Sequence, residues 1–173
     1  MAASPLHSAL AKLQKQYHDA IRDVNTSGII ERFFLESPQL NFLFGGGYPI
    51  GRITQLHGPE SGGKSTLATY IGGEVQRKRK DEHNVVVYVD FERTFETTFA
   101  QKLGLQTDPD HLIFLRPENG EEAFEITQEL VRTNNIGLVI WDSDTTTPSA
   151  AQINDEYGKA CVSPNTEVQF RLA

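Results

Sequence analysis

The sequence is short of the features that mark secreted, membrane-spanning and DNA-coating proteins. Cys161 is the single cysteine in 173 residues, which excludes an intrachain disulfide framework and fits a reducing compartment. No apolar run approaches the roughly 20 residues of a membrane span, and the amino terminus leads into a charged amphipathic segment rather than a signal core. The net charge of −7 gives no overall attraction to nucleic acid. We therefore expect a cytoplasmic protein without membrane contact, whose DNA binding would need a local basic surface.

Residues 58–66 carry the most informative pattern in the sequence. They match the phosphate-binding loop G-x-x-x-x-G-K-[ST] at every fixed position. The backbone N–H groups of such a loop point at phosphate oxygens, Lys64 would reach the β- and γ-phosphates, and Ser65 would offer its hydroxyl to Mg²⁺. The sequence therefore predicts a nucleoside triphosphate site formed by Gly58, Pro59, Glu60, Ser61, Gly62, Gly63, Lys64, Ser65 and Thr66.

Hydrophobic patterns place this loop between a strand and a helix, as its function requires. Short apolar runs predict strands, and amphipathic stretches between them predict helices. Strands that alternate with helices are typical of right-handed βαβ units, so the fold class is α/β with an open parallel sheet and flanking helices. The predicted strands cover residues 52–57, 85–89, 112–115 and 137–141, and the predicted helices cover 64–80, 94–103 and 119–133.

An amphipathic helix is predicted ahead of this core, over residues 6–23. Its apolar residues recur at helical spacing and share one face: Leu6, Leu10, Leu13, Tyr17 and Ile21. Spacing alone leaves open whether this face packs on its own domain or on a neighbouring subunit. Residues 29–50 are predicted to be loop-like, with Gly45-Gly46-Gly47 forming a tight turn against packed aromatic residues.

Acidic residues follow two of the predicted strands. In open α/β sheets the ligand lies at the carboxyl ends of the strands. Asp142 ends the last apolar run and would hold Mg²⁺, directly or through water, opposite Ser65. Glu92 is a candidate for the carboxylate that activates the attacking water. Asp90 lies two residues earlier on the same side of the strand and is the competing candidate.

These motifs resemble the bacterial RecA recombinase family. The likeness runs in register through residues 45–150 and rests on Gly51-Arg52-Ile53, residues 58–66, Asp90-Phe91-Glu92, Lys102-Leu103-Gly104, residues 117–123 and Asp142-Ser143. Phage recombinases of the UvsX type are similar, so a bacterial source and a phage source both fit. The resemblance implies a P-loop ATPase core that uses ATP and Mg²⁺. It also implies a filament on single-stranded DNA that drives strand exchange in homologous recombination and DNA repair.

The resemblance assigns roles to individual residues as well. It implies that Glu92 is the water-activating base, that Phe99 stacks on adenine, and that Glu96 lies near the adenine edge. Phe99 stands where the family usually has tyrosine, which keeps the stacking and loses a hydroxyl. It further implies that the helix over residues 6–23 docks on the next protomer of the filament.

The family core is longer than this sequence. A further strand normally lies between the P-loop strand and the Asp142 strand and carries a polar residue that senses the γ-phosphate. Two DNA-binding loops normally follow the Asp142 strand, of which only the approach to the first would fall here, near residues 152–160. We therefore expect an incomplete core and a fragment that is inactive alone.

The last 13 residues, 161–173, resemble the first block of an intein rather than a recombinase. Such a block starts with cysteine, which attacks the preceding carbonyl to form a thioester, here at the Ala160–Cys161 bond. A split intein, with a complementary half as partner, and a plain truncation with an ordinary cysteine both stay open. The expected organisation is a polymerisation helix over 1–28, the amino-terminal part of the ATPase core over 29–160, and the intein segment or truncation tail over 161–173.

Two other functions compete with the recombinase. One is a different ATPase of the same fold, such as a hexameric helicase or a ring ATPase. The other is a split-intein precursor that awaits protein splicing. Glu60 in the phosphate loop and the context of Asp90 and Glu92 favour the recombinase.

Overall fold

The computed structural model describes residues 5–17, 30–79, 83–143, 146–148 and 166–172. The chain divides into two compact units, Met1–Glu31 and Arg32–Ala173. The first contains helix α1 (Pro5–Gln16), whose apolar residues Leu6, Leu10 and Leu13 are exposed. The predicted helix over 6–23 is thus confirmed through residue 16, and its part from residue 18 lies outside the described residues. No described helix has the length and apolarity needed to cross a membrane.

The second unit is built on a five-stranded sheet with the order β3-β7-β6-β4-β5. Strands β4, β5 and β6 are parallel neighbours, as the sequence predicts for βαβ units. Residues 166–172, for which no strand is predicted, form β7, which pairs antiparallel with both β3 and β6. The strands are β3 (Ile53–Gly58), β4 (Val85–Asp90), β5 (Leu112–Leu115), β6 (Ile136–Asp142) and β7 (Thr166–Leu172).

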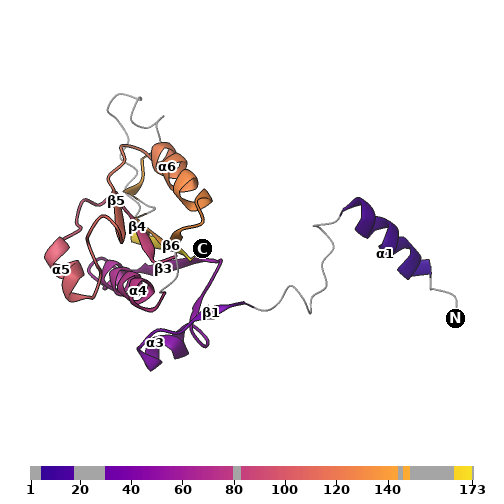
Figure 1. The fold of residues 1–173 in the computed structure, drawn as a ribbon, viewed down its shortest axis with the longest axis horizontal. Helices are drawn as coiled ribbons and strands as arrows, with labels where there is room; N and C mark the ends of the chain where they lie inside the picture. Colours follow the sequence, from indigo (N-terminus) through magenta and orange to yellow (C-terminus); the bar gives the residue numbers. More distant parts are fainter. Residues whose placement is uncertain (1–4, 18–29, 80–82, 144–145, 149–165, 173) are drawn as a thin grey trace. The chain divides into compact units, whose positions relative to one another are not determined.

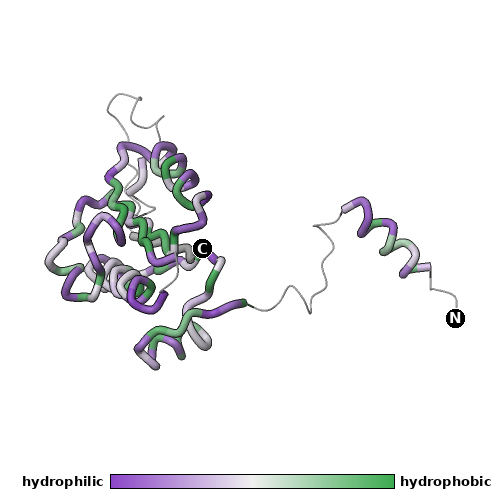
Figure 2. Tube along the Cα trace, in the orientation of Figure 1, coloured by the Kyte–Doolittle hydropathy of each residue, from purple (hydrophilic) through white to green (hydrophobic). Residues whose placement is uncertain are grey.

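Helices cover both faces of this sheet (Figure 1). Helix α4 (Lys64–Lys78) packs on one face through Ala68, Ile71 and Val75, and α5 (Thr97–Lys102) adds Ala100 to the same cluster. Helix α6 (Gly120–Arg132) packs Ala123 on the other face. Residues of β4 alternate between the two clusters, and the strands form the apolar centre of the unit in Figure 2. Helix α5 begins at Thr97, three residues later than predicted.

The segment before β3 holds more structure than the predicted loop. Helix α3 (Pro38–Leu43) begins after Ser37, whose hydroxyl accepts a hydrogen bond from the Leu40 N–H. Strands β1 (Arg32–Phe33) and β2 (Tyr48–Pro49) form a separate antiparallel pair. The three glycines, Gly45 to Gly47, all have positive φ and form the predicted turn.

Buried polar side chains fix α4 against its surroundings. Glu74 is fully buried, and its Oε2 atom accepts a hydrogen bond from the Glu36 N–H at 2.8 Å and pairs with Lys78 at 3.1 Å. Gln76 donates to the carbonyls of Gln106 and His111 at 3.1 and 2.9 Å. Because buried polar groups are costly to leave unpaired, these bonds hold the helix in one position. Helix α4 therefore presents its first turn at a fixed place beside the sheet.

Gly73 provides the sharpest test of this packing. A Cβ atom at Gly73 would lie 2.6 Å from the Gly104 carbonyl carbon, whereas one at Gly72 would lie 3.0 Å from the flexible end of Leu105. We expect Gly73→Ala to lower the free energy of unfolding by about 1–3 kcal/mol, because backbone cannot give way as a side chain can. Gly72→Ala is the matched control, since both changes gain the helix propensity of alanine. Urea denaturation of both variants measures this, and equal stability of the two would contradict the close approach.

Candidate functional site

The phosphate-binding loop joins the end of β3 to the start of α4. The loop turns tightly at Gly62, whose N–H donates to the Pro59 carbonyl at 3.2 Å. Gly63 caps α4 with φ +83° and gives the first turn no side-chain hydrogen bond. A Cβ atom at Gly58 or Gly63 would meet no heavy atom within 4 Å, so the backbone there borders open space. A helix N-terminus that lacks a side-chain cap and borders open space fits a bound phosphate.

Lys64 lies over this loop. Its Nζ atom donates to the carbonyls of Gly58 and Pro59 at 3.0 and 2.8 Å. These carbonyls hold the ammonium at the mouth of the loop, where a phosphate would meet it. The predicted contact set from Gly58 to Thr66 therefore runs from the last residue of β3 through the loop into the first turn of α4, with the Lys64 charge held at the loop.

Asp142 ends β6 and is almost fully buried, with 1% of its surface exposed. Its Oδ2 atom accepts a hydrogen bond from the Tyr88 hydroxyl at 2.8 Å, whereas its Oδ1 atom has no hydrogen-bond partner among the described residues. Burial raises the pKa of Asp142, and hydrogen bonds from Ser65 and Tyr88 oppose this. Asp142 and Ser65 thus lie together, at the end of β6 and in the first turn of α4.

Glu92 follows β4 by two residues and is half-buried. Its N–H group lies 3.4 Å from the Asp142 carbonyl, which ties the loop after β4 to the end of β6. Burial raises the pKa of Glu92, a hydrogen bond from Ser143 lowers it, and the charges of Asp142 and Lys64 act in opposite directions. The Oε1 atom is buried without a hydrogen-bond partner in the described part of the chain. Glu92 thus has an oxygen that no neighbouring side chain occupies.

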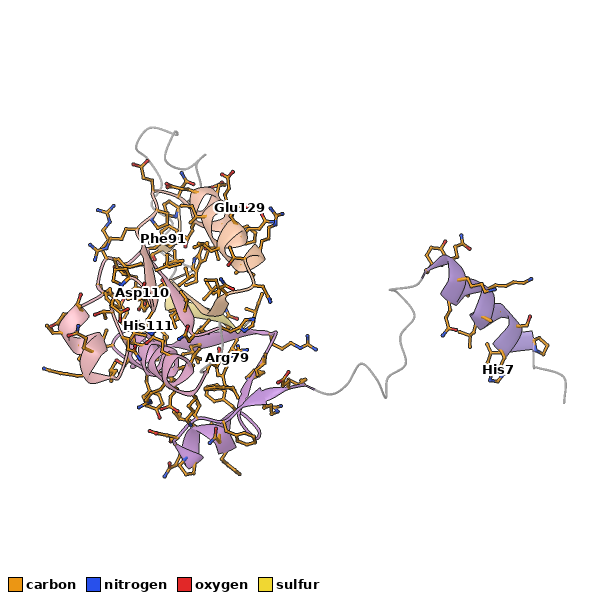
Figure 3. The ribbon with its side chains drawn as sticks, viewed as in Figure 1. His7, Arg79, Phe91, Asp110, His111 and Glu129 are labelled. Carbon is orange, nitrogen blue, oxygen red and sulfur yellow. The ribbon has the colours of Figure 1, made fainter. Side chains whose placement is uncertain are left out.

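Asp90 differs from Glu92 because its carboxylate is already occupied. Arg116 donates to Asp90 Oδ2 from Nε and Nη2 at 3.2 and 3.1 Å, and the Thr94 N–H donates to Oδ1 at 3.3 Å. The next residue, Phe91 (Figure 3), lies in the cluster on the α6 side of the sheet, and its ring centroid lies 5.5 Å from that of Trp141. Asp90 therefore has a structural role, as an ion-paired anchor for the start of the loop that carries Glu92.

The donors present suit Mg²⁺ only if phosphate and water complete its shell. No group of three or more histidine, cysteine, aspartate or glutamate side chains that could hold a metal occurs among the residues described. Mg²⁺ in nucleotide sites binds one or two carboxylates together with substrate phosphates and water. Ser65 and the free Oδ1 atom of Asp142 fit that pattern, next to the phosphate-binding loop.

The remaining predicted site residues lie on or beside α5, or outside the described part of the chain. Glu96 caps α5, and its carboxylate accepts a hydrogen bond from the Thr98 hydroxyl. Phe99 lies on α5 with 45% of its surface exposed, so its ring has an open side. Cys161 lies outside the described residues.

Three residues of the site receive no role from the sequence: Tyr88, Arg116 and Ser143. Strand alternation could have indicated Tyr88 from the sequence. Residues two apart in a strand share a side, so Tyr88 lies on the same side of its strand as Asp90. Arg116 and Ser143 had a weaker signal, since each comes directly after or near the end of an apolar run. Their partners, Asp90 and Glu92, lie on another strand or the loop after it, and only the folded sheet shows those pairs.

Comparisons with known proteins show which family the chain resembles. The RecA N-terminal domain family matches residues 4–172. The chain is 33% identical over 162 residues to Protein RecA of Chlorobaculum parvum, covering 91% of this chain and 45% of that protein. It is 36% identical over 157 residues to Protein RecA of Wigglesworthia glossinidia brevipalpis, covering 88% and 46%.

A third relative, Protein RecA of Bacteroides thetaiotaomicron, is 38% identical over 120 residues, which cover 69% of this chain and 34% of that protein. The chain thus spans less than half the length of these curated relatives. The family match covers nearly the whole chain, and it includes the phosphate-binding loop, Glu92 and Asp142. The chain therefore belongs to the RecA family.

Proposed function

We propose that this chain forms the ATP-binding part of a RecA-type recombinase, a DNA-dependent ATPase that acts in homologous recombination and DNA repair. One observation carries this proposal: the phosphate-binding loop, Asp142 and Glu92 lie at the carboxyl ends of β3, β6 and β4 in a RecA family chain. In an open sheet that edge is where a nucleotide binds.

The residues of the loop would bind and orient the triphosphate. The backbone from Gly58 to Thr66 surrounds the phosphates, and the Lys64 ammonium exchanges its carbonyl partners for phosphate oxygens. Ser65 and Asp142 would hold Mg²⁺, which supplies positive charge to the phosphoryl oxygens when bound. The raised pKa of Asp142 supports this role, because a buried carboxylate in that position gains most from a nearby cation.

Glu92 would take the proton from the attacking water. A general base works best when its pKa lies near the working pH, and burial moves the pKa of Glu92 in that direction. Asp90 is poorly suited to the same role, because Arg116 neutralises it and occupies its Oδ2 atom. Phe99 would stack on adenine and Glu96 would lie at the adenine edge, a proposal that the exposure of Phe99 supports.

Two substitutions separate nucleotide binding from hydrolysis. We expect Lys64→Ala to abolish detectable binding of a fluorescent ATP analogue, because a charge and its donors vanish together. We expect Glu92→Gln to keep that binding and, in the reconstituted full-length protein, to slow hydrolysis by roughly 10²–10⁴-fold, because only the base is lost. Binding is measured by fluorescence titration, and hydrolysis by single-turnover phosphate release with single-stranded DNA present. Equal loss of ATP binding in both variants would sink the assignment.

Single-stranded DNA and further copies of the chain are the proposed partners. Helix α1 supports self-association, because Leu6, Leu10 and Leu13 form an exposed apolar stripe that suits docking on another subunit. The net charge of −7 opposes DNA binding by the chain as a whole. The DNA contacts of the recombinase would therefore come from a local basic surface.

We expect this chain to bind single-stranded DNA weakly, with a dissociation constant no tighter than the roughly 10⁻⁶ M of non-specific contacts. Fluorescence anisotropy of a labelled oligonucleotide at physiological salt measures it, with a salt titration as control. Binding in the nanomolar range would contradict this expectation and show that the chain already contains the DNA site.

A second proposal concerns Cys161 and has support from the sequence alone. We propose that Cys161 opens a split intein and attacks the Ala160 carbonyl when a complementary half binds. Residues 166–172 form β7 in the structure, so splicing would require this strand to leave its place between β3 and β6.

Splicing is tested by mass spectrometry of the chain mixed with a candidate partner half. We expect a product joined after Ala160, and we expect Cys161→Ala to block it while leaving ATP binding unchanged, because the two sites use different residues. A precursor that stays intact with a partner that splices other chains would show that Cys161 is an ordinary cysteine.

A further inference from the structure

Tyr88 makes a contact at the centre of the site that the roles assigned above do not include. It lies on β4, with 2% of its surface exposed, and its hydroxyl donates to Asp142 Oδ2 at 2.8 Å. Register explains the contact, because Tyr88 is paired with Ile140, two residues before Asp142 on β6. The side chain thus reaches along the sheet to the last residue of the neighbouring strand.

The Tyr88 ring is held in place by its aromatic neighbours. The Phe95 ring lies edge-on at 4.8 Å between centroids, and the Phe114 ring lies at 6.2 Å. A ring fixed in this way carries its hydroxyl at a defined position, with little conformational entropy left to lose. The donor to Asp142 is therefore built into the core and does not depend on a mobile side chain.

The hydrogen bond from Tyr88 makes the two oxygens of the Asp142 carboxylate unequal. Oδ2 accepts from Tyr88, whereas Oδ1 is buried and has no hydrogen-bond partner within the described residues. A hydrogen bond to a charged acceptor is stronger than one between neutral groups, so it fixes the rotation of the carboxylate.

The same hydroxyl lies beside the helix that carries Ser65. The Thr69 side chain lies next to the Tyr88 oxygen, and its own hydroxyl donates to the Ser65 carbonyl at 2.8 Å. Tyr88 thus contacts Asp142 directly, and through Thr69 it contacts α4, the helix that carries Ser65. Asp142 and Ser65 are the two protein groups of the proposed Mg²⁺ site. A buried polar network of this kind holds its members in one arrangement.

We propose that Tyr88 is a positioning residue for the Mg²⁺ site, which holds Asp142 Oδ2 so that Oδ1 is the oxygen available to the metal. This inference rests on the proposed ATP-binding function. It makes Tyr88 the outer partner of a metal ligand, and such partners typically change metal affinity by 10–100-fold when they are removed.

The test compares Tyr88→Phe with Tyr48→Phe in the full chain. Both residues are buried tyrosines, and both changes remove one hydroxyl, but Tyr48 lies on β2 and its hydroxyl bonds to Thr54. Energy transfer from Trp141, the only tryptophan in the sequence, to a mant-labelled ATP reports binding, first in EDTA and then over a Mg²⁺ titration. Melting temperatures without metal and with Mg²⁺ and ATP give an independent second measurement.

We expect Tyr88→Phe to bind mant-ATP in EDTA as the wild type does. In the Mg²⁺ titration, we expect it to need about tenfold more Mg²⁺ to reach half of the Mg²⁺-dependent change in energy transfer. We expect Tyr48→Phe to keep the wild-type Mg²⁺ midpoint, even if it melts at a lower temperature. The rise in melting temperature on adding Mg²⁺ and ATP should shrink in Tyr88→Phe alone.

A wild-type Mg²⁺ midpoint in Tyr88→Phe would overturn the inference and leave the proposed function standing. An equal shift in Tyr48→Phe would also overturn it, because loss of any buried hydroxyl would then suffice. A wild-type chain that binds no mant-ATP with or without Mg²⁺ would overturn the proposed function, and the inference with it.

Discussion

Three acidic side chains are partly or fully buried at the ends of two neighbouring strands, and the site is arranged around the cost of burying them. Asp90 and Asp142 face each other in register at the ends of β4 and β6, and Glu92 follows two residues later. Negative charges on residues that are paired across neighbouring strands repel strongly where water is excluded. Arg116 neutralises Asp90 directly, while Lys64 only moderates the charges of Glu92 and Asp142. The remaining negative charge makes this edge of the sheet favourable for a divalent cation.

A cation site of this kind depends on the position of α4, because Lys64 and Ser65 come from its first turn. The helix cannot slide over the sheet, since Gly73 lies against the backbone of Gly104 and Gln76 is bonded to the chain before β5. A binding site gains affinity when its groups are held in place before the ligand arrives. The packing at the middle of α4 would therefore contribute to the proposed nucleotide binding at its end, although none of those residues would touch the nucleotide.

Sequence patterns predict the parts of the molecule whose structure is determined by residues close together in the chain. The phosphate-binding loop has a fixed spacing, and β4, β5 and β6 are apolar runs long enough to be recognised. The short helix α3 was missed because its six residues give too little periodicity. Strand β7 was missed for a different reason: it is defined by pairing with β3 and β6, which come from distant parts of the chain. The Arg116–Asp90 pair is non-local in the same way, whereas the position of Tyr88 follows from strand alternation.

Strand β7 also changes what can reach the nucleotide edge of the sheet. It lies between β3 and β6, where the family resemblance implies a strand whose polar residue senses the γ-phosphate, but it runs in the opposite direction. A parallel strand brings its carboxyl end to this edge, whereas β7 brings its start, with Thr166 opposite Gly58 and Val168 opposite Asp142. A sensor supplied by this strand would therefore have to come from its first residues. In the proposed function, the groups that would bind nucleotide in this arrangement are those of β3, β4, β6 and the first turn of α4.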